Sequence, residues 1–282
     1  MWSTLALFTT LAGPVPPFLL EALAFSVPAL ATFAAWLGRG ERLFDKLRLP
    51  WRVWALGVGG LFGYHALYFL AMQNAPPVEA SLIAYLSPLM IVLCSALLPG
   101  ERLRWWHAVG AVIALAGAFL VVSDGGRVAF HAANAFGYGI AFACAVVWSA
   151  YSVLSRLFGE VPSDRVGVFC AATAILAAFC HVLFETTAWP QGWSWAAVLA
   201  LGIGPVGAAF FTWDHGCKHG DIRALGALFY AAPLASTVLL VLFGRAEASW
   251  TVAAAAVLIV AGAALASRDL LVSRPGAAPA VG

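Results

Sequence analysis

Charged side chains are scarce in this sequence. Of its 282 residues, 10% are Asp, Glu, Lys or Arg, whereas 63% are hydrophobic. A soluble chain of this length needs far more polar surface, and the strands of a transmembrane barrel alternate in polarity, whereas the apolar runs here are continuous. The composition therefore predicts an all-α integral membrane protein surrounded by the lipid bilayer.

The motifs of enzymes and metal sites are also missing. The five cysteines are scattered without a CxxC pair, so we expect neither a metal site nor a disulfide framework. The chain has no HExxH, no GxSxG and no paired acidic motif. The stretch GIGPVG at 202–207 fits the dinucleotide-binding pattern, but it lies inside an apolar run, where no βαβ unit forms. We expect no enzymatic activity, no catalytic residue, no cofactor, no metal and no nucleic-acid partner.

Long apolar runs dominate what the sequence does contain. Charges, prolines and glycine clusters divide it into ten runs, at residues 2–13, 17–38, 51–73, 77–98, 104–123, 134–157, 163–185, 192–214, 221–243 and 249–268. If the connections alternate between the two sides of the membrane, thirteen Lys and Arg residues fall on one side and two, Arg127 and Arg245, on the other. Because cytoplasmic loops are enriched in basic residues, this asymmetry predicts that both termini are cytoplasmic.

The second half of the chain repeats the first. At an offset of 145 residues, AYLSP at 84–88 aligns with FYAAP at 229–233, so that Tyr85 meets Tyr230. Each half contains five runs, and an odd number of spans inverts the second copy relative to the membrane.

This pattern predicts ten transmembrane helices arranged as two inverted five-helix repeats around a central cavity. The repeats comprise residues 1–124 and residues 125–282, the second including a short cytoplasmic tail. Inverted repeats are typical of secondary transporters, whose substrate site lies near the midplane where the halves meet.

The first run is shorter than the roughly twenty residues that a helical span needs. At an offset of 146 residues, Trp2-Ser3 aligns with Trp148-Ser149, which follows the further apolar-leaning stretch 134–147. We therefore expect that about fourteen residues of the first span are absent from the N-terminus of this sequence. Trp2 and Ser3 are then expected near the middle of the membrane.

Three features resemble one family of transporters. They are the WS pairs of the first and sixth runs, the Tyr-x-x-Pro of the fourth and ninth, and LLPGERLRWWHAVGAVIALAGAFLVV at 97–122. Together they resemble the drug/metabolite transporter superfamily of the EamA type. The resemblance implies a bacterial inner-membrane protein that exports aromatic and other neutral amino acids by alternating access. Alternatives left open are an exporter of amphipathic drugs or metabolites, a passive facilitator and, without a supporting motif, an intramembrane enzyme.

Hydroxyl and aromatic side chains recur at helical spacing inside the runs. Trp148, Tyr151, Ser152 and Ser155 lie at i, i+3, i+4 and i+7, which places one aromatic residue and three hydroxyls on one helix face. A helix that faces lipid has no need of such polar groups. Proline inside a span also frees a backbone carbonyl for a ligand. The predicted substrate-binding residues are Trp2, Ser3, Tyr64, His65, Tyr68, Tyr85, Ser87, Trp148, Ser149, Tyr151, Ser152 and Tyr230.

The alternative interpretation of these residues is helix packing, since hydroxyls and tyrosines often bond between membrane helices. Ser87 also stands where some relatives are expected to carry a bulky aromatic residue, which weakens a strict preference for aromatic substrates. The ionisable groups within the runs are few. Glu21 lies in the second run, His65 is the candidate proton acceptor or a structural histidine, and Asp214 is expected in a solvated cytoplasmic turn. A monomer is compatible with the sequence, which does not fix the oligomeric state.

Overall fold

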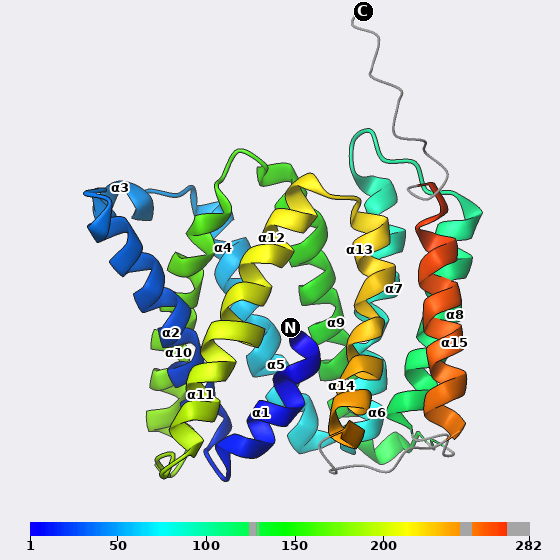
Figure 1. Ribbon diagram of the computed structural model, residues 1–282, viewed down its shortest axis with the longest axis horizontal. Helices are drawn as coiled ribbons and strands as arrows, with labels where there is room; N and C mark the ends of the chain where they lie inside the picture. Colours follow the sequence, from blue (N-terminus) through cyan, green and yellow to red (C-terminus); the bar gives the residue numbers. More distant parts are fainter. Residues whose placement is uncertain (124–127, 129, 243–249, 270–282) are drawn as a thin grey trace, which may run out of the picture.

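The computed structural model describes residues 1–123, 128, 130–242 and 250–269. Within these residues the chain is helical and contains no strand (Figure 1). The helices are α1 (Leu5–Ala12), α2 (Pro17–Gly38), α3 (Leu43–Leu47), α4 (Trp51–Val58), α5 (Tyr64–Asn74), α6 (Pro77–Ala84), α7 (Leu86–Cys94), α8 (Trp105–Val122), α9 (Ala135–Ser155), α10 (Val166–Phe184), α11 (Ser194–Ile203), α12 (Ala209–His219), α13 (Ile222–Phe229), α14 (Ala231–Leu242) and α15 (Trp250–Ala266).

Eight helical segments of the described chain are long and apolar enough to cross a membrane. They are Pro17–Gly38, Trp51–Asn74, Pro77–Leu97, Trp105–Val122, Ala132–Phe158, Ser163–Phe184, Ser194–His219 and Ile222–Leu239. The first and tenth expected runs correspond to shorter apolar helices, Trp2–Ala12 and Trp250–Ala266. A multi-pass helical membrane protein is therefore confirmed, with eight segments that reach spanning length.

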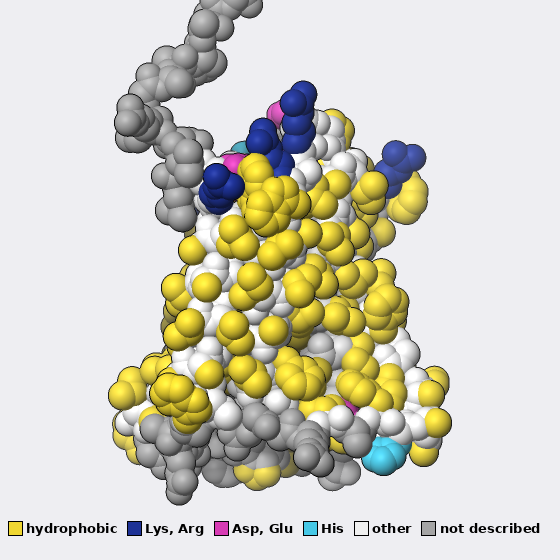
Figure 2. Space-filling model, turned by 90° about the vertical axis from the view of Figure 1, so that its right-hand side faces the viewer, with side chains coloured by type: hydrophobic (Ala, Val, Ile, Leu, Met, Phe, Trp, Pro, Cys, Tyr) yellow, Lys and Arg dark blue, Asp and Glu magenta, His cyan; other side chains and the backbone are white. Residues whose placement is uncertain are grey.

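Basic side chains gather at one end of the bundle, above a hydrophobic flank (Figure 2). This basic end contains the connections from α2 to α4, α7 to α8, α9 to α10 and α12 to α13, and the end of α15 (Figure 1). No Lys or Arg occurs in the described parts of the connections at the opposite end. Arg127 and Arg245, expected on that opposite side, and Arg274, expected on the basic side, lie outside the described residues.

Irregular backbone recurs at the same offset in both halves. A π-helical turn at Gly59–Gly63 is matched 145 residues later by one at Gly204–Ala208. At the same offset, the break between α6 and α7 at Tyr85 is matched by the break between α13 and α14 at Tyr230. The offset noticed in the sequence therefore relates individual helix ends and distortions as well as apolar runs.

The two breaks have a common cause in proline. Pro88 and Pro233 are each the third residue of a new helix, where the missing N–H costs nothing but the ring opposes continuation of the preceding helix. A new helix also begins with unpaired N–H groups. One of these, on Leu89, donates to the hydroxyl oxygen of Tyr230 at 3.0 Å, which ties α7 to the matching break in the second half.

The counterpart helices α8 and α15 pack through small residues. A Cβ at Gly110 would lie 2.5 Å from the carbonyl oxygen of Gly262, and one at Gly262 would lie 2.5 Å from the nitrogen of Ala114. Small residues let helix backbones approach closely in membranes, where dispersion contacts drive association. Gly110 and Gly262 therefore serve the close packing of α8 against α15.

We predict that Gly110→Ala destabilises the protein by about 1–3 kcal/mol, because the added methyl group meets backbone atoms that cannot rotate away. Thermal unfolding in lipid nanodiscs measures the effect. Gly139→Ala on α9 is the matched control, since a Cβ there meets nothing within 4 Å. That change should leave stability unchanged or raise it by about 0.5–1 kcal/mol. Equal melting temperatures for the two variants would contradict the close packing of α8 on α15.

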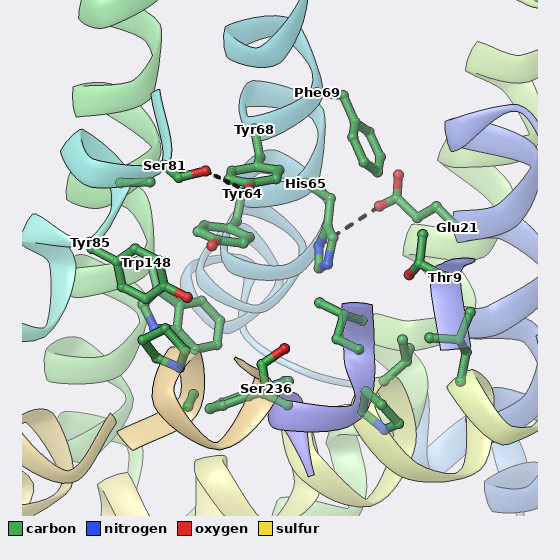
Figure 3. Close-up of a pocket in the computed structure, with 18 of the residues that line it drawn as sticks. Thr9, Glu21, Tyr64, His65, Tyr68, Phe69, Ser81, Tyr85, Trp148 and Ser236 are labelled. Carbon is green, nitrogen blue, oxygen red and sulfur yellow. Dashed lines mark hydrogen bonds and ion pairs between the residues drawn. The ribbon is translucent and has the colours of Figure 1, made fainter. Parts of the chain in front are cut away.

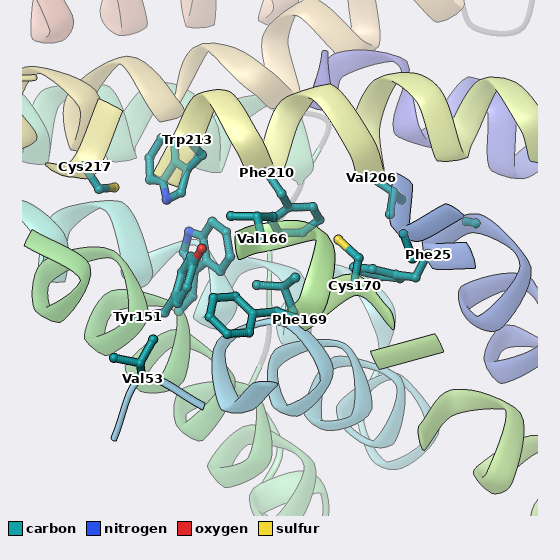
Figure 4. Packing of buried hydrophobic residues seen from close by; sticks show 14 of the residues in the cluster. Phe25, Val53, Tyr151, Val166, Phe169, Cys170, Val206, Phe210, Trp213 and Cys217 are labelled. Carbon is teal, nitrogen blue, oxygen red and sulfur yellow. The ribbon is translucent and has the colours of Figure 1, made fainter. Parts of the chain in front are cut away.

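The main buried cluster lies where α9, α10 and α12 meet (Figure 4). The Tyr151 ring packs directly on the π-helical turn of the first half, where a Cβ at Gly60 would lie 2.4 Å from the ring. Phe169 packs in the same way against Gly57. These glycines allow large aromatic rings of the second half to approach the first half closely.

Candidate functional site

A cavity of about 700 Å³ occupies the centre of the bundle (Figure 3). Its lining extends from Trp2 and Trp148 in the interior to Pro17 and Val122, at helix ends remote from the basic end. The cavity therefore runs from mid-bundle toward the opposite end. The predicted residues that line it are Trp2, Tyr64, His65, Tyr68, Tyr85, Ser87 and Trp148.

Aromatic rings close the deep end of the cavity. The Trp2 ring lies 5.6 Å from that of Trp148 and 5.1 Å from that of Trp213, centroid to centroid. Phe210 and Phe229 lie 5.8 and 5.0 Å from Trp2. Edge-on and offset ring contacts at these separations are favourable and exclude water. We call these five residues the aromatic floor.

Hydroxyl groups occupy one wall of the cavity. Tyr64 and Tyr68, one turn apart on α5, have nearly parallel rings, and the Tyr68 hydroxyl lies 3.3 Å from that of Ser81 on α6. Tyr85 and Ser236 belong to the same lining (Figure 3). These hydroxyls form a polar wall beside the aromatic floor, and we call it the hydroxyl wall.

His65 and Glu21 are neighbours in the lining of the cavity. The Nδ1 atom of His65 lies 2.7 Å from the carbonyl oxygen of Leu61, which only accepts hydrogen bonds, so Nδ1 carries a hydrogen and donates it there. The nearer Glu21 oxygen is 3.9 Å from the same nitrogen, beyond hydrogen-bond distance. The π-helical turn of α4–α5 thereby fixes one tautomer of His65 and orients the ring into the cavity.

The remaining predicted residues lie outside the cavity lining, and all of them except Ser3 connect helices. Ser149 donates to the carbonyl of Ser87 at 3.0 Å, and Ser152 accepts from the indole N–H of Trp213 at 3.0 Å. Tyr151 is buried on the far side of Trp148, and Tyr230 caps α7. Ser3 precedes α1 beside Trp2 and is absent from the lining.

Sequence reasoning missed several lining residues. They include Thr9, Glu21, Phe25, Phe69, Ser81, Phe210, Phe229, Ser236 and Thr237. Most are apolar or hydroxyl residues that do not differ in sequence from those that face lipid. Glu21 did carry a signal, because an ionisable group inside a span is a functional candidate by default.

Asp214 is not in a solvated turn, which corrects the sequence expectation. It lies within α12, is 2% exposed, and pairs with Lys218 one turn later at 2.7 Å. Helix α12 continues one full turn beyond the apolar run, so the acidic side chain points into the bundle near Tyr151, whose hydroxyl donates to it at 3.5 Å. A lysine four residues on supplies the compensating charge that a buried carboxylate needs.

An ion-pair network closes the basic end, behind the aromatic floor. Glu101 binds Arg156 at 2.9 Å and Arg223 at 3.6 Å, so one carboxylate joins the α7–α8 connection to the end of α9 and the start of α13. Arg156 also donates to the carbonyl of Gly220 at 2.6 Å. Burial alone would raise the pKa of Asp221, but hydrogen bonds and charge from Arg223 lower it overall.

Comparison with known proteins agrees with this architecture. The chain matches the EamA-like transporter family over residues 1–123 and 135–268. It is 56% identical to the aromatic amino acid exporter YddG of Ancylobacter novellus, over 95% of this chain and 93% of that protein. The Salmonella typhimurium protein of the same name is 24% identical over 78% of each chain.

A solved structure is also similar. A crystal structure with 55% sequence identity matches with a TM-score of 0.89, over 95% of this chain and 93% of that chain. The family expected from the WS, Tyr-x-x-Pro and 97–122 sequences is confirmed. This chain belongs to the EamA-like transporter family and is a membrane transporter, not an enzyme.

Proposed function

We propose that this protein exports aromatic amino acids from the bacterial cytoplasm across the inner membrane. The observation that carries the proposal is the cavity of about 700 Å³ whose deep end is the aromatic floor. Its volume suits a small organic molecule, and the ring faces suit an aromatic side chain. The relative with 56% identity is named for export of aromatic amino acids, which supports the same substrate class here.

The proposed topology has ten transmembrane helices in two inverted repeats, residues 1–124 and 125–282. The family match in two parts and the recurrence of π-helical turns and helix breaks 145 residues apart support this arrangement. In it, Trp2–Ala12 and Trp250–Ala266 are the first and tenth membrane helices. The basic end is cytoplasmic, with both termini on that side, because cytoplasmic connections are enriched in Lys and Arg.

The proposed mechanism is alternating access. In this orientation the cavity faces the periplasm, while the aromatic floor and the Glu101 network close the cytoplasmic path. Export requires a second state in which the cytoplasmic side opens and the periplasmic side closes around the same central site. We place the substrate ring against the aromatic floor and its carboxylate along the hydroxyl wall, at Tyr64, Tyr68 and Tyr85.

Counterflow in proteoliposomes tests the proposal. Purified protein is reconstituted with unlabelled phenylalanine inside, and uptake of labelled phenylalanine, tryptophan, threonine and a cationic dye is followed with and without a pH gradient. We expect counterflow of both aromatic amino acids and little of threonine. Movement of the dye without any amino acid would replace the proposal with an amphipathic exporter. Equilibration of labelled amino acid without transient accumulation would indicate a passive facilitator.

The proposed transport unit is the monomer, because the cavity is walled by helices of both halves of one chain. Reconstitution at high lipid excess, where most vesicles hold a single copy, should preserve the counterflow rate per protein. A rate that falls with dilution would show that a second copy is required.

A further inference from the structure

Glu21 is a buried carboxyl group without a hydrogen-bond partner. It lies on the second turn of α2, is 4% exposed, and lines the central cavity. Neither of its carboxylate oxygens bonds to any side chain or backbone group in the part of the chain that the structure describes. The ionisable ring of His65 lies 3.9 Å away, but it donates its Nδ1 hydrogen to the carbonyl oxygen of Leu61 instead. Such a group is costly to bury, so something outside the chain is expected to compensate it.

Among the described residues, the two other glutamates near the same end of the bundle, Glu79 and Glu185, are both satisfied. Glu185 accepts from the backbone nitrogens of Phe18 and Leu19, at 2.8 and 3.1 Å, and pairs with His181 at 2.8 Å. Glu79 accepts from the hydroxyl of Tyr138. Glu185, which caps α2, and Glu79, which joins α6 to α9, are therefore structural. Glu21 differs from both because it faces the cavity without a hydrogen-bond donor.

The surroundings of Glu21 fit a cation attached to an apolar body. The ring centroids of Phe25 and Phe69 lie 5.2 and 6.4 Å from that of His65, and both residues line the cavity with Glu21. Aromatic faces attract an organic ammonium group, and a carboxylate accepts strong hydrogen bonds from it. Figure 3 shows Glu21 pointing into the pocket, across from the tyrosine hydroxyls.

We propose that Glu21 is the ammonium-binding group of the cavity and that the transported molecule is held by its amine. This inference rests on the proposed function and deepens it, because it assigns the two charged groups of an amino acid to different partners. The ammonium binds Glu21, and the adjacent carboxylate faces the hydroxyl of Tyr64, which lines the same cavity and can donate to it. The aromatic side chain then extends toward the aromatic floor.

Four indole ligands that carry different charged groups separate these contacts. Binding of tryptophan, tryptamine, indolepropionate and N-acetyltryptophan is measured by calorimetry on the full chain in detergent. We expect the unaltered protein to bind tryptophan and tryptamine, both of which carry an ammonium, roughly tenfold or more tightly than the two ligands without one. Equal affinity for tryptophan and N-acetyltryptophan overturns the proposal, whatever any variant does.

Glu21→Gln assigns the amine preference to this side chain. We expect roughly tenfold or greater weakening for tryptophan and tryptamine, and no weakening for indolepropionate. Glu21→Asp keeps the carboxylate and should keep most of the preference. Glu79→Gln is the matched control, because it makes the same change near the same end of the bundle, outside the cavity lining, and retains an acceptor for Tyr138.

The failure of this proposal differs from failure of the proposed function. If amine-bearing ligands bind through Glu21 but no amino acid undergoes counterflow, export of aromatic amino acids is wrong and the ammonium site stands. If aromatic amino acids undergo counterflow and Glu21→Gln binds them as the unaltered protein does, the ammonium site is wrong and the proposed function stands. A Glu21→Gln protein that does not fold leaves the ligand series and Glu21→Asp to decide, since loss of amine preference in Glu21→Asp alone also counts against the proposal.

Discussion

Trp148→Ala is expected to reduce counterflow of aromatic amino acids to background. Trp148 belongs to the aromatic floor, with its ring 5.6 Å from Trp2 and 5.3 Å from Tyr64, so it forms the surface on which we place the substrate ring. Losing that face removes about 2 kcal/mol of ring packing from the bound state, equivalent to roughly thirtyfold in affinity. The measurement is tryptophan binding by calorimetry together with counterflow in proteoliposomes.

Two further variants separate this effect from unfolding. Removing a buried indole costs about 3–5 kcal/mol of stability, so the melting temperature of each variant is recorded in nanodiscs. Trp148→Phe keeps a ring in the floor and should retain most of the stability and part of the affinity. Trp193→Ala, at a side chain that is 90% exposed, should leave both unchanged. Normal tryptophan affinity in a folded Trp148→Ala protein would place the substrate ring elsewhere.

The sequence predicted the features of the fold that depend on periodicity. Apolar length marked the spans, and matched Tyr, Pro and Gly residues marked the relation between the halves, because a helix break or a close approach needs a specific residue type. Tyr85 and Tyr230 are an example, since each stands at a helix break and precedes a proline by three residues.

The candidate site was only partly predictable, since a helical stripe indicates which residues share a face but not which neighbour the face meets. Trp148 and Tyr151 belong to one stripe, yet Trp148 lines the cavity while Tyr151 packs on Gly60. Tyr85 and Tyr230 are related by the repeat, yet one lines the cavity and the other caps α7. Repeats related by inversion place equivalent residues in different surroundings whenever one half is closed and the other open.

Buried ionisable groups show the same limit. Asp214 was expected in solvent because it lies next to a polar segment, and its burial depends on the extra turn of α12 and on Lys218. Glu21 was recognised only as a charge inside a span, because the absence of a partner is a property of three-dimensional packing. A single sequence gives residue type and depth, whereas the hydrogen-bond partners that decide a role come from other helices.

The second large effect is expected at the basic end, where Glu101→Ala should open the path that the structure closes. Glu101 is the anion between Arg156 and Arg223, so its removal leaves two guanidinium groups side by side. The side chain is 12% exposed, between a surface pair and a fully buried one, which sets the loss at about 1–3 kcal/mol. In the proposed mechanism the network is made only in the closed arrangement, so that energy shifts the population toward the cytoplasm-open state by roughly fivefold to a hundredfold.

Chemical labelling of Cys217 can detect this opening, so no new cysteine needs to be introduced. It is a free cysteine on α12, 0% exposed, and its carbonyl oxygen accepts a hydrogen bond from Arg156 at 3.1 Å. A membrane-impermeant maleimide added on the basic side, followed by peptide mass spectrometry, gives its rate of modification. We expect that rate to rise roughly tenfold in Glu101→Ala, while Cys170, buried between α10 and the core, stays unmodified.

The neighbouring acid Glu160 supplies the control, because it is exposed on the same end. Glu160→Ala removes the same charge and should leave Cys217 protected. Saturating tryptophan tests the link to transport, since a substrate that binds the cavity in its present arrangement should slow the modification of Cys217 in Glu101→Ala. Equal modification of Cys217 in the two variants would show that the aromatic floor alone closes the cytoplasmic path. Modification of Cys217 and Cys170 together would indicate unfolding of the bundle and would contradict a gate at Glu101.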